Sequence, residues 1–275
     1  MAGRFSRGLG VVDDSIDVFR DNPRLALLPF LSLLATGSAF LVVLGVGLRY
    51  GVVESVLEND ILRYAGVFAG ISISSSVGTF FNAAIVHCAS QYFDGESTSV
   101  RDGLAAAWRV RRTIALWSVT AATLGTVLYV IDEKFGVFGS AARIMFDLGW
   151  ALLTFFIVPV IVLEETASLR SLLRESGDAF RETWGESVSA SLGVSFVFLP
   201  VGVVGLVGLG WAYFFGSGAL AFLVGAAGFV VLVGSMVAAQ VVGVVARTAL
   251  YRYAADGERF GPCVGRDLET VFSTE

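Results

Sequence analysis

The chain has 275 residues, of which 55% are hydrophobic and 16% are charged, whereas an average soluble domain carries roughly 25% charged residues. A soluble protein of this length needs more charge to solvate its surface, so the composition indicates that lipid covers much of the chain. The net charge of −5 argues against nucleic acid as a partner, because its phosphates require a basic patch.

The residue usage gives further indications about source and compartment. Lys134 is the one lysine among 19 basic residues, and this acidic, arginine-rich composition is typical of a halophilic, high-GC source. Cys88 is expected in a helix and Cys263 in a polar tail, which is not the pattern of a disulfide framework. Residues 1–24 contain no apolar core of the signal-peptide type, so we expect the first apolar segment to be a retained anchor.

Long apolar runs predict membrane-spanning helices, since ~30 Å of hydrocarbon requires about 20 mostly apolar residues. The first run follows Asn22-Pro23, which suits an N-cap and a first-turn proline. Residues 187–246 carry no charge, and Phe215-Gly216-Ser217-Gly218 is their strongest turn signal, so we expect two helices there. We therefore predict one all-α membrane domain over residues 1–275, a polytopic bundle with spans at residues 25–48, 64–93, 113–131, 143–163, 188–214 and 219–250.

The placement of basic residues favours six spans and gives their orientation. With six spans, 15 of the 19 basic residues lie on one side of the membrane and four on the other. A seventh span would weaken this bias to 11 against eight. The positive-inside rule then places both termini in the cytoplasm, and we predict a multi-pass protein of the cell (plasma) membrane.

Four segments on the predicted cytoplasmic side have the spacing of amphipathic helices. Residues 4–20 carry large apolar side chains on one helical face, which are Phe5, Leu9, Val12, Ile16 and Phe19. Residues 100–111, 169–184 and 263–272 show similar patterns, and Trp184 falls on the apolar side of the third. Each segment is too short and too polar to span, so we expect these helices to lie in the headgroup plane with their arginines near anionic lipid.

Matching sequences at the ends of two spans predict an internal repeat. Asp94-Gly95-Glu96 follows the second span, and Asp256-Gly257-Glu258 follows the sixth. The shared pattern predicts a tight turn in which glycine relieves the exit from the helix. The repeating unit would be an interfacial helix and a two-span hairpin, used three times, with a fourth interfacial helix at the end. The alternative is that cytoplasmic loops of this kind simply look alike.

The two ends of the chain carry a resemblance to known families. The residues are Asn22-Pro23-Arg24-Leu25 with Leu28-Pro29, and Ala249-Leu250-Tyr251-Arg252-Tyr253-Ala254 with Asp256-Gly257-Glu258. They resemble archaeal multi-pass families of unknown function, which are similar to the bacterial YciC-like proteins and to the membrane domain preceding some glycerophosphodiester phosphodiesterases. The resemblance covers nearly the whole chain and implies a six-helix membrane domain without assigned chemistry. The catalytic phosphodiesterase domain has no counterpart in this sequence.

Residues that carry chemistry are scarce. His87 is the only histidine, and Cys88 beside it points about 100° away around a helix, which does not suit a zinc site. Glu164-Glu165…Arg170 has the wrong spacing for an intramembrane protease motif, and Ser217 has no histidine base in a later span. We expect no catalytic residue, metal or cofactor, although an uncharacterised membrane enzyme stays an alternative.

The second predicted span has the most regular pattern. Small or polar residues recur every four positions, at Gly66, Gly70, Ser74, Gly78 and Asn82. This stripe favours a central helix that packs closely against its neighbours, with a substrate path as the alternative. Glycines of the fifth and sixth spans permit a similar approach, and Pro29, Pro159 and Pro200 are expected to kink their helices.

Five polar residues inside the spans are the candidate site residues, namely Asn82, His87, Gln91, Asp147 and Gln240. Asp147 is one helical turn from Arg143, and an ion pair at the membrane surface explains it more simply than proton transport does. The leading hypothesis is a non-enzymatic scaffold or envelope assembly factor that interacts with lipid, a second copy or another membrane protein. The alternative is a transporter or channel for an uncharged or lipid-like solute.

Overall fold

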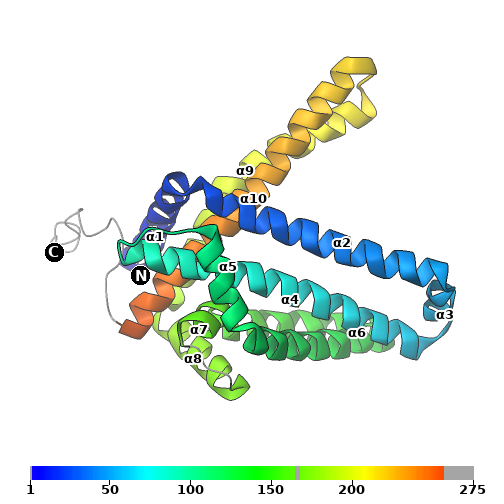
Figure 1. The fold of residues 1–275 in the computed structure, drawn as a ribbon, viewed down its shortest axis with the longest axis horizontal. Coiled ribbons are helices and arrows are strands. Elements are labelled where there is room, and N and C mark those ends of the chain that lie inside the picture. The colour runs from blue at the N-terminus through cyan, green and yellow to red at the C-terminus, as the bar shows by residue number, and fades with distance from the viewer. Residues whose placement is uncertain (1, 165–167, 257–275) are drawn as a thin grey trace. The chain divides into compact units, whose positions relative to one another are not determined.

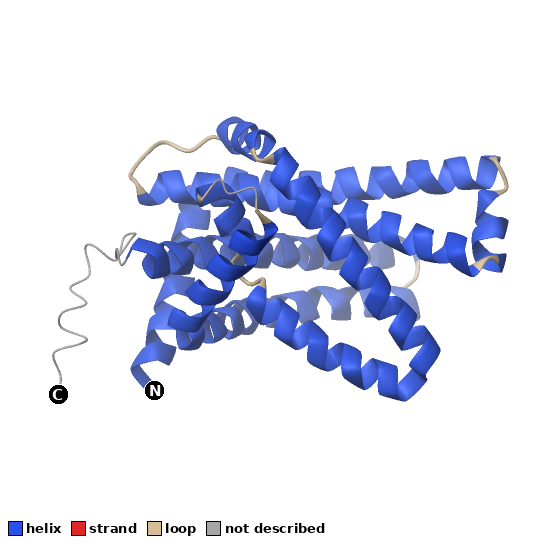
Figure 2. Ribbon diagram, turned by 90° about the horizontal axis from the view of Figure 1, so that it is seen from below, coloured by secondary structure: helices blue, strands red, loops and turns tan. Residues whose placement is uncertain are grey.

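The computed structural model describes residues 2–164 and 168–256, and every regular element in those ranges is a helix (Figures 1 and 2). The elements are α1 (Ala2–Asp21), the 3-10 helix η1 (Pro23–Ala26), α2 (Leu27–Arg49), α3 (Val52–Glu58), α4 (Asp60–Phe93), α5 (Val100–Arg109), α6 (Arg111–Leu153), α7 (Ile157–Leu163), α8 (Leu169–Glu182), α9 (Trp184–Phe214) and α10 (Gly218–Asp256). The predicted all-α class is confirmed.

Six segments of the described chain are long and apolar enough to cross a membrane. They are Pro23–Arg49, Asp60–Phe93, Arg111–Phe135, Arg143–Leu163, Trp184–Phe214 and Gly218–Ala255, and each matches one predicted span. The protein itself buries only 11–28% of the most apolar window of each segment. Lipid must cover the remaining apolar surface, because water would solvate it poorly. The chain is therefore a multi-pass membrane protein.

The third and fourth spans belong to one continuous helical element, α6, that turns back on itself. Trp117 and Trp150 stack with ring centroids 5.7 Å apart, whereas a straight helix would separate them by about 50 Å. Arg143 Nη1 also donates to Asp132 Oδ2 at 3.0 Å across the same reversal. The hairpin thus reverses between the two span segments, as the sequence predicts, although its backbone stays helical throughout.

The described chain divides into two compact units. The larger one comprises residues 27–88 and 97–181, which include α2, α3, most of α4, and α5 to α8. Within it α5 packs closely on α4, because a Cβ at Gly103 would lie 2.7 Å from the Ala84 carbonyl oxygen. Ser99 begins α5 as its N-cap and accepts the Asp102 backbone N–H.

The other unit comprises residues 1–26, 89–96 and 182–275. Its described part contains α1, η1, the end of α4, and the antiparallel helices α9 and α10. The latter two touch at backbone level, since a Cβ on Gly205 would lie 2.7 Å from the Gly228 carbonyl oxygen. The close approach predicted for the glycines of these two spans is confirmed at this crossing. The turn predicted at residues 215–218 is also confirmed, and Gly218 adopts a φ of 64° there.

The face of α1 that contacts protein overlaps the predicted apolar face only in part. Gly8, Val12, Ser15 and Val18 are buried, whereas Leu9 is 43% exposed. Gly8 lies against Ser189 and the Glu186 carbonyl of α9. Leu9 and Val12 of the predicted face also contact α9, since a Cβ at Gly193 would lie 2.9 Å from Leu9 Cδ2 and 3.1 Å from Val12 Cγ2. The predicted apolar face stays partly uncovered, and the side chain of Phe5 lies outside the described set.

The two other short helices on the predicted cytoplasmic side lie near their expected positions, at α5 and α8. Helix α8 ends two residues before the predicted boundary, and Trp184 instead begins α9 with 56% of its surface exposed. The fourth segment, residues 263–272 with Cys263, lies outside the described residues. The placement of these helices in a headgroup plane and the threefold repeat stay predictions.

The exit of α4 has the tight turn that the sequence predicts. Glu96 N–H donates to the Gln91 carbonyl at 2.9 Å, and Gly95 N–H donates to the Tyr92 carbonyl at 3.0 Å. These two bonds form a Schellman motif, which requires a left-handed residue after the helix. Gly95 meets that requirement with a φ of 74°. The matching residues 257 and 258 lie outside the described chain.

Candidate functional site

A groove of about 560 Å³ lies along the first half of α4, within the larger unit. Helix α2 contributes one wall through Phe40, and α3 contributes Val56. The lining is mostly apolar and consists of Phe40, Val56, Arg63, Gly66, Val67, Gly70, Ile71, Ser74 and Ser75. Its volume falls within the ~300–1,000 Å³ typical of small-molecule pockets.

The floor of the groove is the small-residue stripe of α4. A Cβ at Gly70 would lie 3.6 Å from Phe40 Cε1, and one at Gly66 would lie 3.7 Å from Val56 Cγ1. Both are ordinary van der Waals distances, and a Cβ at Gly78 would meet nothing within 4 Å. The expected close packing of a neighbouring backbone on this stripe is therefore wrong. The missing side chains leave room for the groove instead.

A polar cluster lies at the end of the groove where α4 begins. Arg63 lines the groove, and its Nη2 pairs with Asp60 Oδ1 at 2.9 Å and with Glu133 of α6. The guanidinium also lies 5.6 Å from the centre of the Tyr64 ring, and Tyr64 contacts Tyr129 edge to face. Charged and aromatic side chains of this kind mark the boundary between hydrocarbon and water.

Two of the five candidate polar residues have partners close by in the sequence. Asp147 Oδ2 lies 3.5 Å from Arg143 Nε, one helical turn away, so the predicted ion pair is confirmed. Gln91 Nε2 donates to Glu96 Oε2 at 3.5 Å within the turn that ends α4.

The other three candidates lie at separate positions along two helices. Asn82 and His87 are half-buried on α4, beyond the residues that line the groove. Gln240 is exposed on α10, which belongs to the other unit. Within residues 2–164 and 168–256, no group of three histidine, cysteine or acidic side chains has the geometry to hold a metal ion. Asn82, His87 and Gln240 each interact with another group of the protein.

The fourth span is broken, and a serine from α8 bridges the break. Helix α6 ends at Leu153 and α7 begins at Ile157, two residues before Pro159. The proline ring would clash with the carbonyl four residues earlier in a continuous helix. Ser176 Oγ donates to the Leu153 carbonyl at 2.7 Å and accepts the Phe156 N–H at 3.1 Å. The fully buried Ser176 thus satisfies backbone groups that the break releases.

A second polar contact that the sequence did not predict joins α10 to the end of α4. Arg252 is 12% exposed, and its Nη2 lies 2.6 Å from Asp94 Oδ1. Its Nη1 donates to the Ser90 carbonyl and hydroxyl at 3.0 and 3.1 Å. Nearby, Tyr92 donates to Asp21 of α1 at 2.6 Å. The end of α4 and the turn after it therefore contact both α1 and α10 within their unit.

The chain matches the model of a known protein family. Residues 61–261, nearly three quarters of the sequence, match the model of a family of unknown function, DUF6159. The chain belongs to this family. The region shared with DUF6159 runs from the start of α4 to beyond the end of α10, so it includes the groove floor and the broken fourth span. No curated protein and no solved structure matches the chain.

Proposed function

We propose that this member of DUF6159 is a non-enzymatic membrane scaffold that binds a lipid acyl chain in the groove along α4. The observation that carries the proposal is the combination of Phe40, Val56 and the glycine floor of α4 around one apolar groove. An acyl chain is flexible and wholly apolar, so it fills an elongated groove without leaving a polar group unpaired. We assign both termini to the cytoplasmic side of the plasma membrane because most of the basic residues fall on the side that contains them.

Scarcity of reactive groups supports a role without catalysis. The whole chain contains one histidine and two cysteines, and Cys88 is buried. Nucleophilic catalysis requires a base next to the attacking group, and metal catalysis requires several converging ligands. A protein of this composition is better suited to holding lipid or a neighbouring membrane protein during assembly of the cell envelope.

The test fills the groove from its floor. In the variant Gly70→Leu the first added atom fits beside Phe40 at 3.6 Å, and the rest of the side chain occupies the space of the acyl chain. The matched control is Gly78→Leu, which lies on the same helix and has no neighbour within 4 Å of its added Cβ. Each protein is purified in mild detergent, and bound phosphatidylcholine is counted by native mass spectrometry.

We expect the wild type and Gly78→Leu to retain bound phosphatidylcholine and Gly70→Leu to lose most of it. Equal retention by Gly70→Leu and the wild type would show that the groove does not hold lipid. Loss from both variants would show that any added bulk on α4 displaces lipid, which would also contradict the assignment to the groove.

The broken fourth span favours a second candidate, a transporter for an uncharged solute, because discontinuous helices often form transport sites. In this chain, however, the backbone groups at the break already bond to Ser176. They are therefore not available to a solute, which makes this candidate the weaker one. Uptake of a neutral solute into proteoliposomes that Pro159→Ala abolishes would favour the transporter over the scaffold.

A further inference from the structure

The corner between α5 and α6 carries an unusual concentration of positive charge. Arg109, Arg111 and Arg112 occupy three of four consecutive positions around the turn at Val110, and all three are exposed. Each guanidinium adds a full positive charge at any relevant pH. The amino end of α6 lies at the same corner, and its dipole adds to the positive potential.

These arginines lack the carboxylate partners that the exposed Arg20 and Arg174 have. Arg20 pairs with Asp17 at 3.2 Å, and Arg174 pairs with Asp178 at 3.7 Å. Among the residues that the structure describes, no carboxylate lies within 4 Å of Arg109, Arg111 or Arg112. The nearest acid along α5, Asp102, accepts the Ser99 hydroxyl at 2.7 Å. The positive charge of the corner is therefore not neutralised by the protein.

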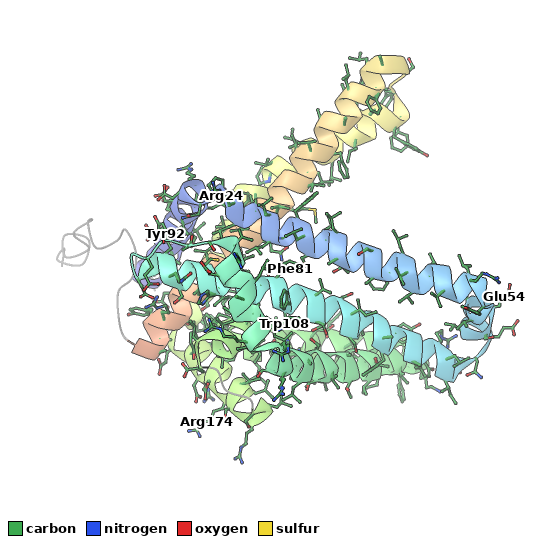
Figure 3. The ribbon with its side chains drawn as sticks, viewed as in Figure 1. Arg24, Glu54, Phe81, Tyr92, Trp108 and Arg174 are labelled. Carbon is green, nitrogen blue, oxygen red and sulfur yellow. The ribbon has the colours of Figure 1, made fainter. Side chains whose placement is uncertain are left out.

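An exposed tryptophan accompanies the arginines. Trp108, which is labelled in Figure 3, is 62% exposed, and the guanidinium of Arg111 lies 5.0 Å from its ring centre. Arg111 Nη1 also donates to the Trp108 carbonyl at 3.0 Å, which fixes the guanidinium over the ring. A large aromatic ring left open beside charged groups suits the headgroup level of a bilayer, where the indole contacts both lipid and water.

The position of the corner in the fold agrees with that setting. The third membrane span begins at Arg111, so Trp108 and the three arginines lie where the chain enters the hydrocarbon. Phosphate groups of lipids occupy this level, and arginine can bond a phosphate through two parallel N–H groups. A soluble anion would not explain the exposed tryptophan.

We infer that the α5–α6 corner, defined as Trp108, Arg109, Arg111 and Arg112, binds the headgroup of an anionic phospholipid. The inference deepens the proposed lipid-binding function by naming a headgroup class, but it uses residues outside the groove. Arg109 and Arg112 bond the phosphate, while Arg111 and Trp108 form the surface against which the headgroup lies. Selection depends on negative charge, so phosphatidylglycerol binds and phosphatidylcholine does so far more weakly.

The test compares two pairs of substitutions that remove equal charge. The variant Arg109→Gln/Arg112→Gln removes two arginines of the corner and leaves the contact between Arg111 and Trp108 intact. The control Arg20→Gln/Arg174→Gln removes two arginines that already have carboxylate partners, with side chains 73% and 81% exposed. Native mass spectrometry of the full chain measures bound phosphatidylglycerol relative to phosphatidylcholine at equal concentrations.

We expect the corner variant to lose its preference for phosphatidylglycerol by roughly thirtyfold, since each basic residue near an anionic surface contributes about fivefold. The control should keep the preference of the wild type. An unchanged preference in the corner variant, or an equal loss in the control, would overturn the inference. Displacement of phosphatidylglycerol by inorganic phosphate at the same phosphate concentration would overturn it as well, because the site would then be one for the free anion.

The groove variant separates this inference from the proposed function. Gly70→Leu should reduce bound phosphatidylcholine but keep the phosphatidylglycerol bound at the corner, so the measured ratio of phosphatidylglycerol to phosphatidylcholine should not fall. A loss of preference in Gly70→Leu equal to that in the corner variant would show that one site accounts for both effects, and the assignment to the corner would be wrong.

Discussion

Small residues occur where helices of this protein touch at backbone level, and large apolar residues occur where no protein covers them. Gly205 and Gly228 meet at the α9–α10 crossing, while Phe196 on α9 is 87% exposed and Phe222 on α10 is 75% exposed. In water the large side chains would be expected inside. In lipid they lose nothing by facing outward, so close packing determines which residues lie between helices.

Gly205→Ala tests the tight crossing. The added methyl group would lie 2.7 Å from both the Gly228 carbonyl oxygen and the Leu232 nitrogen, so α9 and α10 must move apart. We expect the free energy of unfolding in detergent to fall by about 1–3 kcal/mol, the usual cost of overpacking. Gly210→Ala is the control, because its Cβ would meet nothing within 4 Å; an equal loss there would contradict the account.

Glu175 predicts a dependence of stability on pH. Its Oε2 is buried and finds no hydrogen-bond partner among the described residues. Burial raises the pKa of this carboxyl, the Glu164 carboxylate raises it further, and Arg174 lowers it. The folded chain therefore binds this proton more tightly than the unfolded chain does. The resulting stability is present below the ordinary glutamate pKa and is lost as pH rises through the folded-state pKa.

Replacing Glu175 by glutamine should remove that dependence. We expect the melting temperature of Glu175→Gln, relative to the wild type, to increase as pH rises from acidic to neutral. Thermal unfolding followed by circular dichroism over this range measures the difference. The control is Glu182→Gln, an exposed position at the end of the same helix. A difference for Glu175→Gln that stays constant at all pH values would contradict a raised pKa of Glu175 in the folded chain.

At the level of elements, the sequence predicts those features that depend on neighbouring residues. Long apolar runs located all six spans, the glycine at position 95 located a Schellman turn, and the spacing of Arg143 and Asp147 located an ion pair. Each depends on a helical register or a local turn, which the sequence specifies directly.

Features that depend on packing between distant residues could not be predicted. The buried face of α1 is set by Gly8 meeting Ser189, and the apolar pattern of α1 alone does not reveal this contact. The stripe of α4 lines a groove because no helix backbone covers it. Arg252 and Asp94 pair across 158 residues. The sequence does offer one signal for this ion pair. The turn after α4 is acidic, and an arginine lies near the end of the last span.

The break in the fourth span depends on the hydrogen bonds of Ser176. In Ser176→Ala the Leu153 carbonyl loses its donor, and the buried Phe156 N–H loses its acceptor. We expect a loss of about 1–3 kcal/mol in the free energy of unfolding, the cost of a buried polar group left unpaired. Proteolysis should also cut the junction of α6 and α7 faster. Ser171→Ala, on the same helix, serves as the control and should match the wild type.

Considered as a whole molecule, the protein depends on lipid for most of its apolar contacts. No span buries more than 28% of its most apolar window inside the protein. We propose that all six apolar segments of the described chain cross the membrane, which would place both ends of that part of the chain on one side. The groove, the α5–α6 corner and the orientation of the arginines all depend on that arrangement.

Labelling of single cysteines with a membrane-impermeant maleimide in sealed cells tests this arrangement most directly. One protein keeps Cys263 as its accessible thiol, and three others carry Cys263→Ser together with Tyr50→Cys, Ser97→Cys or Ser217→Cys. We predict labelling at positions 50 and 217 in intact cells, and at positions 97 and 263 only after permeabilisation. Labelling of positions 50 and 97 from the same side, or of positions 97 and 263 from opposite sides, would contradict six crossings.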